Sequence, residues 1–223
     1  MRGRCGRVVR ACQTCRVSST DVHPQSRGRS TRGQHRREAL IAAATSLLVE
    51  RGITAISHRA VAARAELPLA ATTYYFASLA DLTQEALQRV TDSWRNTAQG
   101  LVDRTPARLT PREVAAAVLE IATARPAQAS ASHAGGVMAM YERYLEAGRH
   151  ERLRPIVHAY NEELLRLVQE VLARGELPAD RKTAQLALAV VDGGSIYAVA
   201  EGVAPAASAT DLLSDLLVLL RHS

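Results

Sequence analysis

The side chains best suited to hold a metal are three cysteines close to the N-terminus. Cys5, Cys12 and Cys15 are the only cysteines of the chain, and Cys12-Gln-Thr-Cys15 has the spacing of one zinc ligand pair. A structural zinc site needs four ligands, and neither His23 nor His35 belongs to a second pair at the usual spacing. The sequence therefore predicts neither a metal nor another cofactor.

Residue patterns that carry out catalysis are also missing from the sequence. No G-x-S-x-G, H-E-x-x-H, P-loop or G-x-G-x-x-G pattern occurs, and the seven histidines have no ligand spacing. Glu162 and Glu163 are adjacent, so on a helix they point to different faces and do not form one acid–base pair. We therefore expect a binding protein rather than an enzyme.

Positive charge is concentrated at the N-terminus. Residues 1–37 hold ten arginines and one acid, Asp21, which gives +9, whereas the remaining 18 basic and 21 acidic groups give −3. A basic segment in front of a folded domain commonly contacts the phosphates of nucleic acid. We expect residues 1–33 to be a disordered basic arm, because they show no apolar periodicity.

The remaining composition predicts an all-α, intracellular protein. Aromatic residues make up 4% of the chain and alanine and leucine abound, which favours helices over strands. The body has no cysteine, no apolar run long enough for a membrane span is recognised, and the N-terminus lacks the apolar core of a secretory signal. We therefore expect a cytoplasmic protein.

Apolar spacing and capping residues then define about nine helices. The first helix starts at Gln34, buries a stripe that includes Leu40, Leu47 and Leu48, and ends at Gly52. Two short helices follow over 58–64, with Ser57 as N-cap, and over about 69–75. Ser78 opens a longer helix, and two short helices between long ones are typical of a helix-turn-helix.

The second half of the chain carries five further helical patterns. Thr110-Pro-Arg-Glu113 is a capping box, and helices are expected over about 136–147 and 155–174. Asp180 caps a helix that reaches about residue 201, and Ser208-x-x-Asp211 opens the last one. The expected domains are the arm at 1–33, a helix-turn-helix domain at 34–80, and a helical ligand-binding and dimerisation domain at 81–223.

The residues of the first domain resemble those of the TetR family of transcriptional regulators. The resemblance runs from Gln34 to Leu87 and rests on a first helix ending in Glu-Arg-Gly, on Ile53-Thr-Ala-Ile-Ser-His-Arg-Ala-Val-Ala, and on Thr73-Tyr-Tyr-Phe76. Looser likeness extends over Met140–Ala147, Leu153–Val157 and Val191–Gly202. It implies a repressor that binds a palindromic operator in double-stranded DNA as a homodimer and is released by a small, largely apolar effector.

Specific DNA-contacting positions follow from the resemblance. Arg59 occupies a position where members of the family contact a DNA base, and its guanidinium can donate two hydrogen bonds to O6 and N7 of guanine. Phe76 is expected in the core. The implied DNA-binding residues are Ser57, His58, Arg59, Leu69, Ala71, Thr72, Thr73, Tyr74 and Tyr75.

Three positions depart from the family pattern. Glu66 replaces the usual turn glycine, Thr73 replaces a common tyrosine, and Leu79 replaces a phosphate-contacting lysine. If position 66 needs a positive φ, a glutamate costs about 1 kcal/mol there. These departures keep an alternative open, namely a helical dimer that binds a ligand or a protein and no longer reads DNA.

The body supplies candidates for the ligand pocket and the dimer interface. Aromatic and polar residues of the middle helices are expected to line a pocket, and the wide apolar face of the last helix needs more than one partner. The pocket candidates are Trp94, Met138, Tyr141, Tyr144, His158 and Asn161, and the dimerisation candidates are Gly193, Gly194, Leu212, Leu213, Leu216, Leu217 and Leu220.

Overall fold

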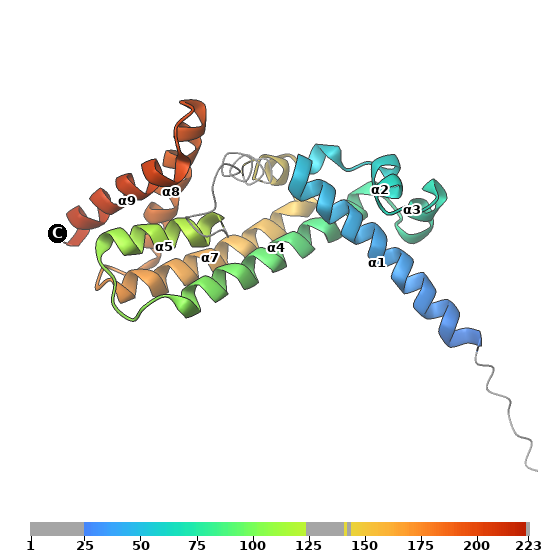
Figure 1. Cartoon of the computed structure of the whole chain (residues 1–223), viewed down its shortest axis with the longest axis horizontal. Helices are drawn as coiled ribbons and strands as arrows, with labels where there is room; N and C mark the ends of the chain where they lie inside the picture. The colour runs from blue at the N-terminus through green and yellow to red at the C-terminus, as the bar shows by residue number, and fades with distance from the viewer. Residues whose placement is uncertain (1–24, 124–140, 142–143, 222–223) are drawn as a thin grey trace, which may run out of the picture. The chain divides into compact units, whose positions relative to one another are not determined.

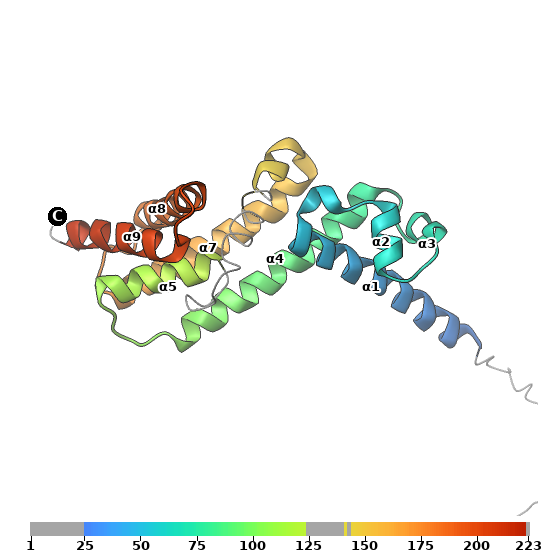
Figure 2. The same ribbon diagram turned by 45° about the horizontal axis from the view of Figure 1, so that its top comes forward.

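A computed structural model describes residues 25–123, 141 and 144–221, and these residues contain helices and no strand (Figures 1 and 2). The N-terminal elements are α1 (Gln25–Arg51), the 3-10 turn η1 (Ile53–Ala55), α2 (His58–Arg64) and α3 (Leu69–Tyr75). They are followed by α4 (Leu79–Arg104), α5 (Pro111–Thr123), η2 (Glu151–Leu153), α7 (Arg154–Arg174), α8 (Arg181–Ala200) and α9 (Pro205–Arg221). Residues 144–149 are also helical. The all-α prediction is confirmed.

Side-chain caps form at four of the helix starts that the sequence predicts. Ser57, Ser78 and Asp180 each accept a hydrogen bond from a backbone N–H of the first turn that follows. Thr110 and Glu113 form a complete capping box, because the Thr110 N–H donates to the Glu113 carboxylate at 2.7 Å and the Glu113 N–H donates to Thr110 Oγ1 at 3.3 Å. These bonds satisfy N–H groups that a helix leaves unpaired at its start.

A first core, centred on α1 to α3, joins the N-terminal helices. The apolar stripe expected for α1 is buried in it, as is Phe76, which is 3% exposed. The first half of α4 contributes Leu82, Leu87 and Val90 to this core, and the start of α7 contributes Ile156 and Val157. Burial of this stripe, rather than helix propensity alone, is what makes such helices stable.

A second core lies among α4, α5, α7, α8 and α9. The α4, α5 and α7 helices run side by side in both views, and α9 packs against α5 and α8 (Figures 1 and 2). Its fully buried members include Val118, Leu167, Val191, Leu213 and Leu217. Because α4 and α7 each supply residues to both cores, these two helices connect the cores directly.

Two helices begin earlier than the sequence predicts. α1 starts at Gln25, so the expectation of a disordered arm is wrong for residues 25–33, which are helical. The three arginines of this segment are good helix formers although Gly28 and Gly33 are not, and extending an existing helix costs far less than nucleating one. α9 starts at Pro205 rather than after Ser208, because proline is suited to the first turn, where its missing N–H would have no partner.

Candidate nucleic-acid interface and ligand site

The α2–α3 pair has the geometry of a helix-turn-helix. Val61 and Ala62 of α2 are buried, Val61 as a member of the first core, and α2 contacts α3. The turn between them reverses at Glu66, whose φ is 53°, so this position does require the left-handed backbone. The Glu66 N–H donates to Ala63 O at 3.2 Å and the Leu67 N–H donates to Ala62 O at 3.0 Å, which is a Schellman ending.

The structure separates the predicted DNA-binding residues into three groups by exposure. Ser57, Arg59, Leu69, Thr73 and Tyr74 are exposed, and Tyr74, at 81%, is the most exposed large apolar side chain among the described residues. His58, Ala71 and Tyr75 are half-buried. Thr72 is completely buried, so the prediction that it contacts DNA is wrong. It occupies the inner face of α3, one residue away from the exposed Thr73.

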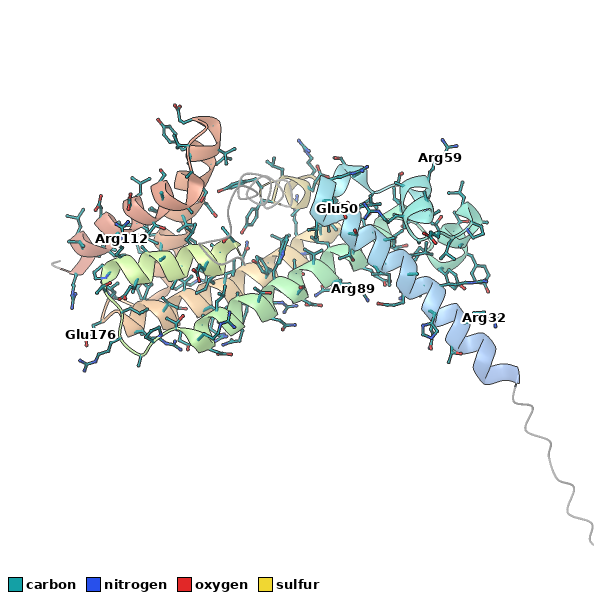
Figure 3. All side chains as sticks on the ribbon, viewed as in Figure 1. Arg32, Glu50, Arg59, Arg89, Arg112 and Glu176 are labelled. Carbon is teal, nitrogen blue, oxygen red and sulfur yellow. The ribbon has the colours of Figure 1, made fainter. Side chains whose placement is uncertain are left out.

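Arg59 is available for an anionic or base partner. It forms no ion pair with any residue that the structure describes, and its side chain extends away from α2 (Figure 3). Arg64, at the other end of α2, donates to the Glu50 carboxylate at 2.8 Å. Hydrogen bonds from Arg64 and Ser46 lower the pKa of Glu50 to about 2. Arg64 therefore joins α2 to α1, whereas Arg59 remains free on the surface.

The other two departures from the expected DNA-binding pattern lie at different depths. Leu79 is half-buried and packs against the first core, so the structure uses this side chain for packing. Thr73 is exposed, and its hydroxyl donates to Ala70 O at 3.2 Å. Among the exposed DNA-binding candidates, Arg59 is therefore the one positively charged side chain that could bind a phosphate.

Contacts of four expected pocket residues, Trp94, Tyr141, Tyr144 and Asn161, are described by the structure. Tyr144 Oη donates to Asn161 Oδ1 at 3.0 Å, and Tyr141 Oη donates to the backbone carbonyl of Asp192. Burial, together with the negative charge of Asp192, raises the pKa of Tyr141 well above its ordinary value. Trp94 packs against both cores.

His158 and Met138 are the other two pocket candidates. His158 is exposed on α7, so its assignment to an enclosed pocket is wrong. Met138 lies outside the described residues. Tyr160 was missed, yet it is 1% exposed and its ring centroid lies 6.1 Å from that of Trp94. Its position on the apolar face of α7 was a possible signal, because that face also carries Val157 and Leu164.

Among the described residues, two buried side-chain polar atoms, Arg95 Nε and Ser195 Oγ, have no hydrogen-bond partner. Ser195 is completely buried in α8, and its hydroxyl forms no hydrogen bond. It lies three residues after Asp192, so the two residues are neighbours on the helix surface. An unsatisfied buried hydroxyl costs about 1–3 kcal/mol, which makes this atom a candidate for bonding a ligand.

A groove of about 470 Å³ separates η1 and the start of α4 from residues 146–153. Ile53, Ile56, Leu79 and Leu153 contribute its apolar wall. Arg152 also lines the groove and forms an ion pair with Asp81 at 3.3 Å, which links η2 to the first turn of α4.

The predicted dimerisation residues do not form one surface. Leu213 and Leu217 are buried within the chain, and a Cβ on Gly194 would lie 3.1 Å from Ala209 Cα, so Gly194 serves the packing of α8 on α9. The assignment of these three residues to a partner contact is therefore wrong. Leu216 and Leu220 are half-buried, whereas Gly193 and Leu212 are exposed.

Large exposed apolar residues nevertheless gather on α8 and α9. They are Leu186, Ile196, Tyr197, Leu212, Val218 and Leu219, with exposures between 43% and 68%. α8 is long and apolar enough to span a membrane by length and composition alone. Its packing against α5, α7 and α9 identifies it instead as a helix of the bundle. Within the described residues, no cluster of His, Cys, Asp and Glu fits a metal, and the cysteines lie outside them.

Comparison with known proteins gives a consistent set of relatives. Residues 109–219 match the family described as Tetracyclin repressor-like, C-terminal domain. The multidrug binding protein EbrR, solved with proflavin, is 30% identical, with a TM-score of 0.58 over 83% of this chain and 99% of EbrR. EbrR has also been solved with ethidium and with malachite green.

More distant solved structures share the fold. A putative transcriptional regulator, SCO7518 from Streptomyces coelicolor A3(2), is 23% identical, with a TM-score of 0.59 over 82% of this chain and 98% of SCO7518. A TetR transcription regulator from Haloarcula marismortui ATCC 43049 is 16% identical, with a TM-score of 0.64 over 84% of this chain and 98% of that regulator. No sequence among curated proteins matches the chain.

Proposed function

The chain belongs to the TetR family of transcriptional regulators, and we propose that this ligand-responsive DNA-binding protein is a cytoplasmic repressor that binds a palindromic operator as a homodimer. The observation that carries the proposal is the exposed face of the helix-turn-helix. Arg59 projects from α2 without an ion pair among the described residues, and Thr73 and Tyr74 are exposed on α3. A guanidinium with no intramolecular partner is suited to read guanine in the major groove.

The exposed apolar residues of α8 and α9 support dimerisation. Tyr197 of α8 and Leu212 and Leu219 of α9 are each more than half exposed, and a soluble monomer rarely leaves so many large apolar side chains together. A two-fold dimer places two recognition helices about one DNA turn or a small multiple apart, so the operator should be palindromic.

The ligand that we propose is a small aromatic cation. Trp94 touches both cores and packs against Tyr160, Tyr141 bonds Asp192 of α8, and Tyr144 bonds Asn161 of α7. Aromatic faces attract cations. Asp192 adds a negative charge beside Tyr141, and Ser195 adds a buried hydroxyl without a partner. The complexes of EbrR with proflavin, ethidium and malachite green support this choice, because each of these dyes is an aromatic cation.

Ligand binding can act on DNA binding through the two shared helices. Trp94 touches both cores, and it lies on α4, the helix that directly follows the recognition helix α3. The ion pair between Arg152 and Asp81 adds a second link. A ligand that prefers one packing of α4 and α7 shifts the population toward a conformer whose recognition helices no longer fit the operator.

The basic N-terminal segment is proposed to add phosphate contacts. Because α1 begins at Gln25, a deletion that ends at residue 33 would cut the helix, whereas deletion of residues 1–24 leaves it whole. We expect that deletion to lower operator affinity and to flatten its dependence on salt, since each lost phosphate contact reduces the log–log slope by about 0.9. An unchanged slope would show that the segment does not contact DNA.

Selection of bound fragments from random duplex DNA tests the main proposal. The full chain should enrich a palindrome, and Arg59→Ala should lose a guanine preference at the same place in both half-sites. Arg108→Ala, which removes an arginine far along the chain from the helix-turn-helix, serves as the matched control. Enrichment of no sequence would favour the alternative of a helical ligand- or protein-binding dimer that does not read DNA.

Fluorescence titration with proflavin, without DNA, tests the ligand site. Asp192→Asn should weaken binding about tenfold or more, because it removes the negative charge nearest Tyr141. Asp103→Asn, which changes an exposed acid of α4, is the matched control. Equal affinities for the two variants would place the cation elsewhere.

A further inference from the structure

One side-chain hydrogen bond joins the two helices of the helix-turn-helix. His58, the first residue of α2, has its Nδ1 atom 3.0 Å from Oγ1 of Thr72 in α3. Thr72 is completely buried, whereas His58 is half-buried beside the exposed Ser57 and Arg59. The bond therefore runs from the edge of the proposed DNA-binding face into the packed interface between the helices.

The hydroxyl of Thr72 decides which nitrogen of His58 carries the proton. A hydroxyl has a single hydrogen to donate, and Thr72 Oγ1 lies 2.8 Å from the carbonyl oxygen of Leu69, which can only accept. The hydrogen must point to that carbonyl, because two oxygen atoms at this distance without a hydrogen between them repel each other. Thr72 Oγ1 is then the acceptor in the contact with His58, so Nδ1 carries a hydrogen and donates it.

The opposite nitrogen is consequently an acceptor in neutral His58. With the hydrogen fixed on Nδ1, Nε2 has a lone pair, and it bonds no atom of the residues that the structure describes. A phosphate oxygen has no hydrogen to give such a lone pair. In the major groove the groups that donate are the exocyclic amino groups of adenine and cytosine, whereas guanine and thymine present oxygen atoms there.

We propose that His58 determines operator specificity, with Thr72 holding its Nδ1–H tautomer so that Nε2 accepts a hydrogen bond from the amino group of an adenine or a cytosine. The proposal rests on the proposed function, because it requires α2 to meet the major groove. It assigns different tasks to neighbouring residues. Arg59 donates to guanine, and His58 accepts from an amino base.

Sequence selection with the full chain and three variants tests the base contact. In His58→Asn the shorter side-chain amide can still donate toward Thr72, but it ends short of the position that Nε2 occupies. This variant should lose an adenine or cytosine preference at one position of each half-site and bind the selected duplex about five- to tenfold more weakly. Thr72→Val, which frees the tautomer, should weaken the same preference, and His150→Asn, outside the helix-turn-helix, should change neither.

Nitrogen-15 NMR of the histidine side chains at pH 8 tests the tautomer without DNA, and the resonances missing in His58→Asn assign the residue. His58 should show a protonated Nδ1 and a bare Nε2. A protonated Nε2 would overturn the proposal, as would a base preference that persists in His58→Asn. A uniform loss of affinity for all duplexes would instead indicate a phosphate contact and overturn the base contact. Failure of the unmodified chain to select any sequence would overturn the proposed function as well.

Discussion

Glutamate occupies a position that favours glycine at two helix ends. Glu66 after α2 and Glu176 after α7 have φ angles of 53° and 55°, and both helices end in the same pair of backbone hydrogen bonds. The end of α8 has this pair of bonds too, but there Gly202 takes the left-handed position with a φ of 69°. Family resemblance indicated this conformation at position 66, because a glycine is usual there. Position 176, which follows a glycine in the sequence, carried no such signal.

Replacing the left-handed glutamates should stabilise the protein. Glu66→Gly and Glu176→Gly should each raise the free energy of unfolding by about 0.5–1 kcal/mol, since the strain that is relieved exceeds the added flexibility of the unfolded chain. Chemical denaturation measures the change. Gly202→Glu, at a site where a Cβ meets no atom within 4 Å, is the reciprocal variant and should destabilise by a similar amount. Stabilisation by neither glutamate replacement would contradict the strain argument.

Ser195 provides a second test at the level of a single residue. Because its buried hydroxyl has no partner, Ser195→Ala should leave the ligand-free protein as stable or more stable, by up to about 1 kcal/mol, and should weaken proflavin binding. Thr91→Val is the matched control, since the buried Thr91 hydroxyl donates to Leu87 O at 3.0 Å. Thermal unfolding and dye titration give the two readouts. A clear loss of stability in Ser195→Ala would show that the hydroxyl is satisfied in solution.

The starts of helices could be predicted from the sequence more fully than the faces that they bury. The caps at Ser57, Ser78 and Thr110 were predictable, because a cap depends on residues within one turn of each other. Which leucines of α9 are buried and which are exposed was not predictable. Its leucines cover two adjacent sides of the helix, and only packing against α5 and α8 selects Leu213 and Leu217 for the core and leaves Leu212 exposed. Thr72 was misassigned for the same reason, because exposure on α3 depends on how α2 packs against it.

The exposed face of α8 and α9 leads to a prediction about assembly. If the proposed dimer forms through α8 and α9, a Tyr197→Asp and Leu212→Asp double variant should be monomeric at concentrations where the unmodified chain dimerises, because it places a charge among the exposed apolar residues of each helix. Sedimentation or light scattering measures the mass. Leu145→Asp, at a leucine that is 59% exposed outside these helices, should remain dimeric. A dimeric double variant would place the interface on another surface.

At the scale of the whole molecule, two cores share two continuous helices. Sequence periodicity identified α4 and α7 as amphipathic helices, yet it did not show that each changes core along its length, since that depends on contacts between distant residues. Trp94 lies where α4 passes from one core to the other. The assignment of Trp94, Tyr141, Tyr144 and Asn161 to a ligand pocket therefore stays a prediction, and the burial of Tyr160 and Ser195 became visible only in the packed structure.

Carboxylates with lowered pKa values predict how stability depends on pH. Hydrogen bonds from Arg64 lower the pKa of Glu50 to about 2, and bonds from Thr110, Arg181 and Thr183 lower those of Glu113, Glu162 and Asp180. A group whose pKa is lower in the folded state stabilises fully above its unfolded pKa and loses this effect as pH falls. The melting temperature should therefore fall between about pH 4.5 and pH 2, and less steeply in Glu50→Gln. Equal slopes would contradict the role of Glu50.

Sedimentation of the selected palindromic duplex with the full chain, before and after addition of malachite green, tests the central claim most directly. We predict that one duplex binds two chains in the absence of dye, and that the dye releases free duplex and a dye-bound dimer. Asp192→Asn should keep the complex intact at the same dye concentration. A complex with a single chain, or one that binds the dye and stays on the DNA, would contradict the account of a dimeric repressor released by an aromatic cation.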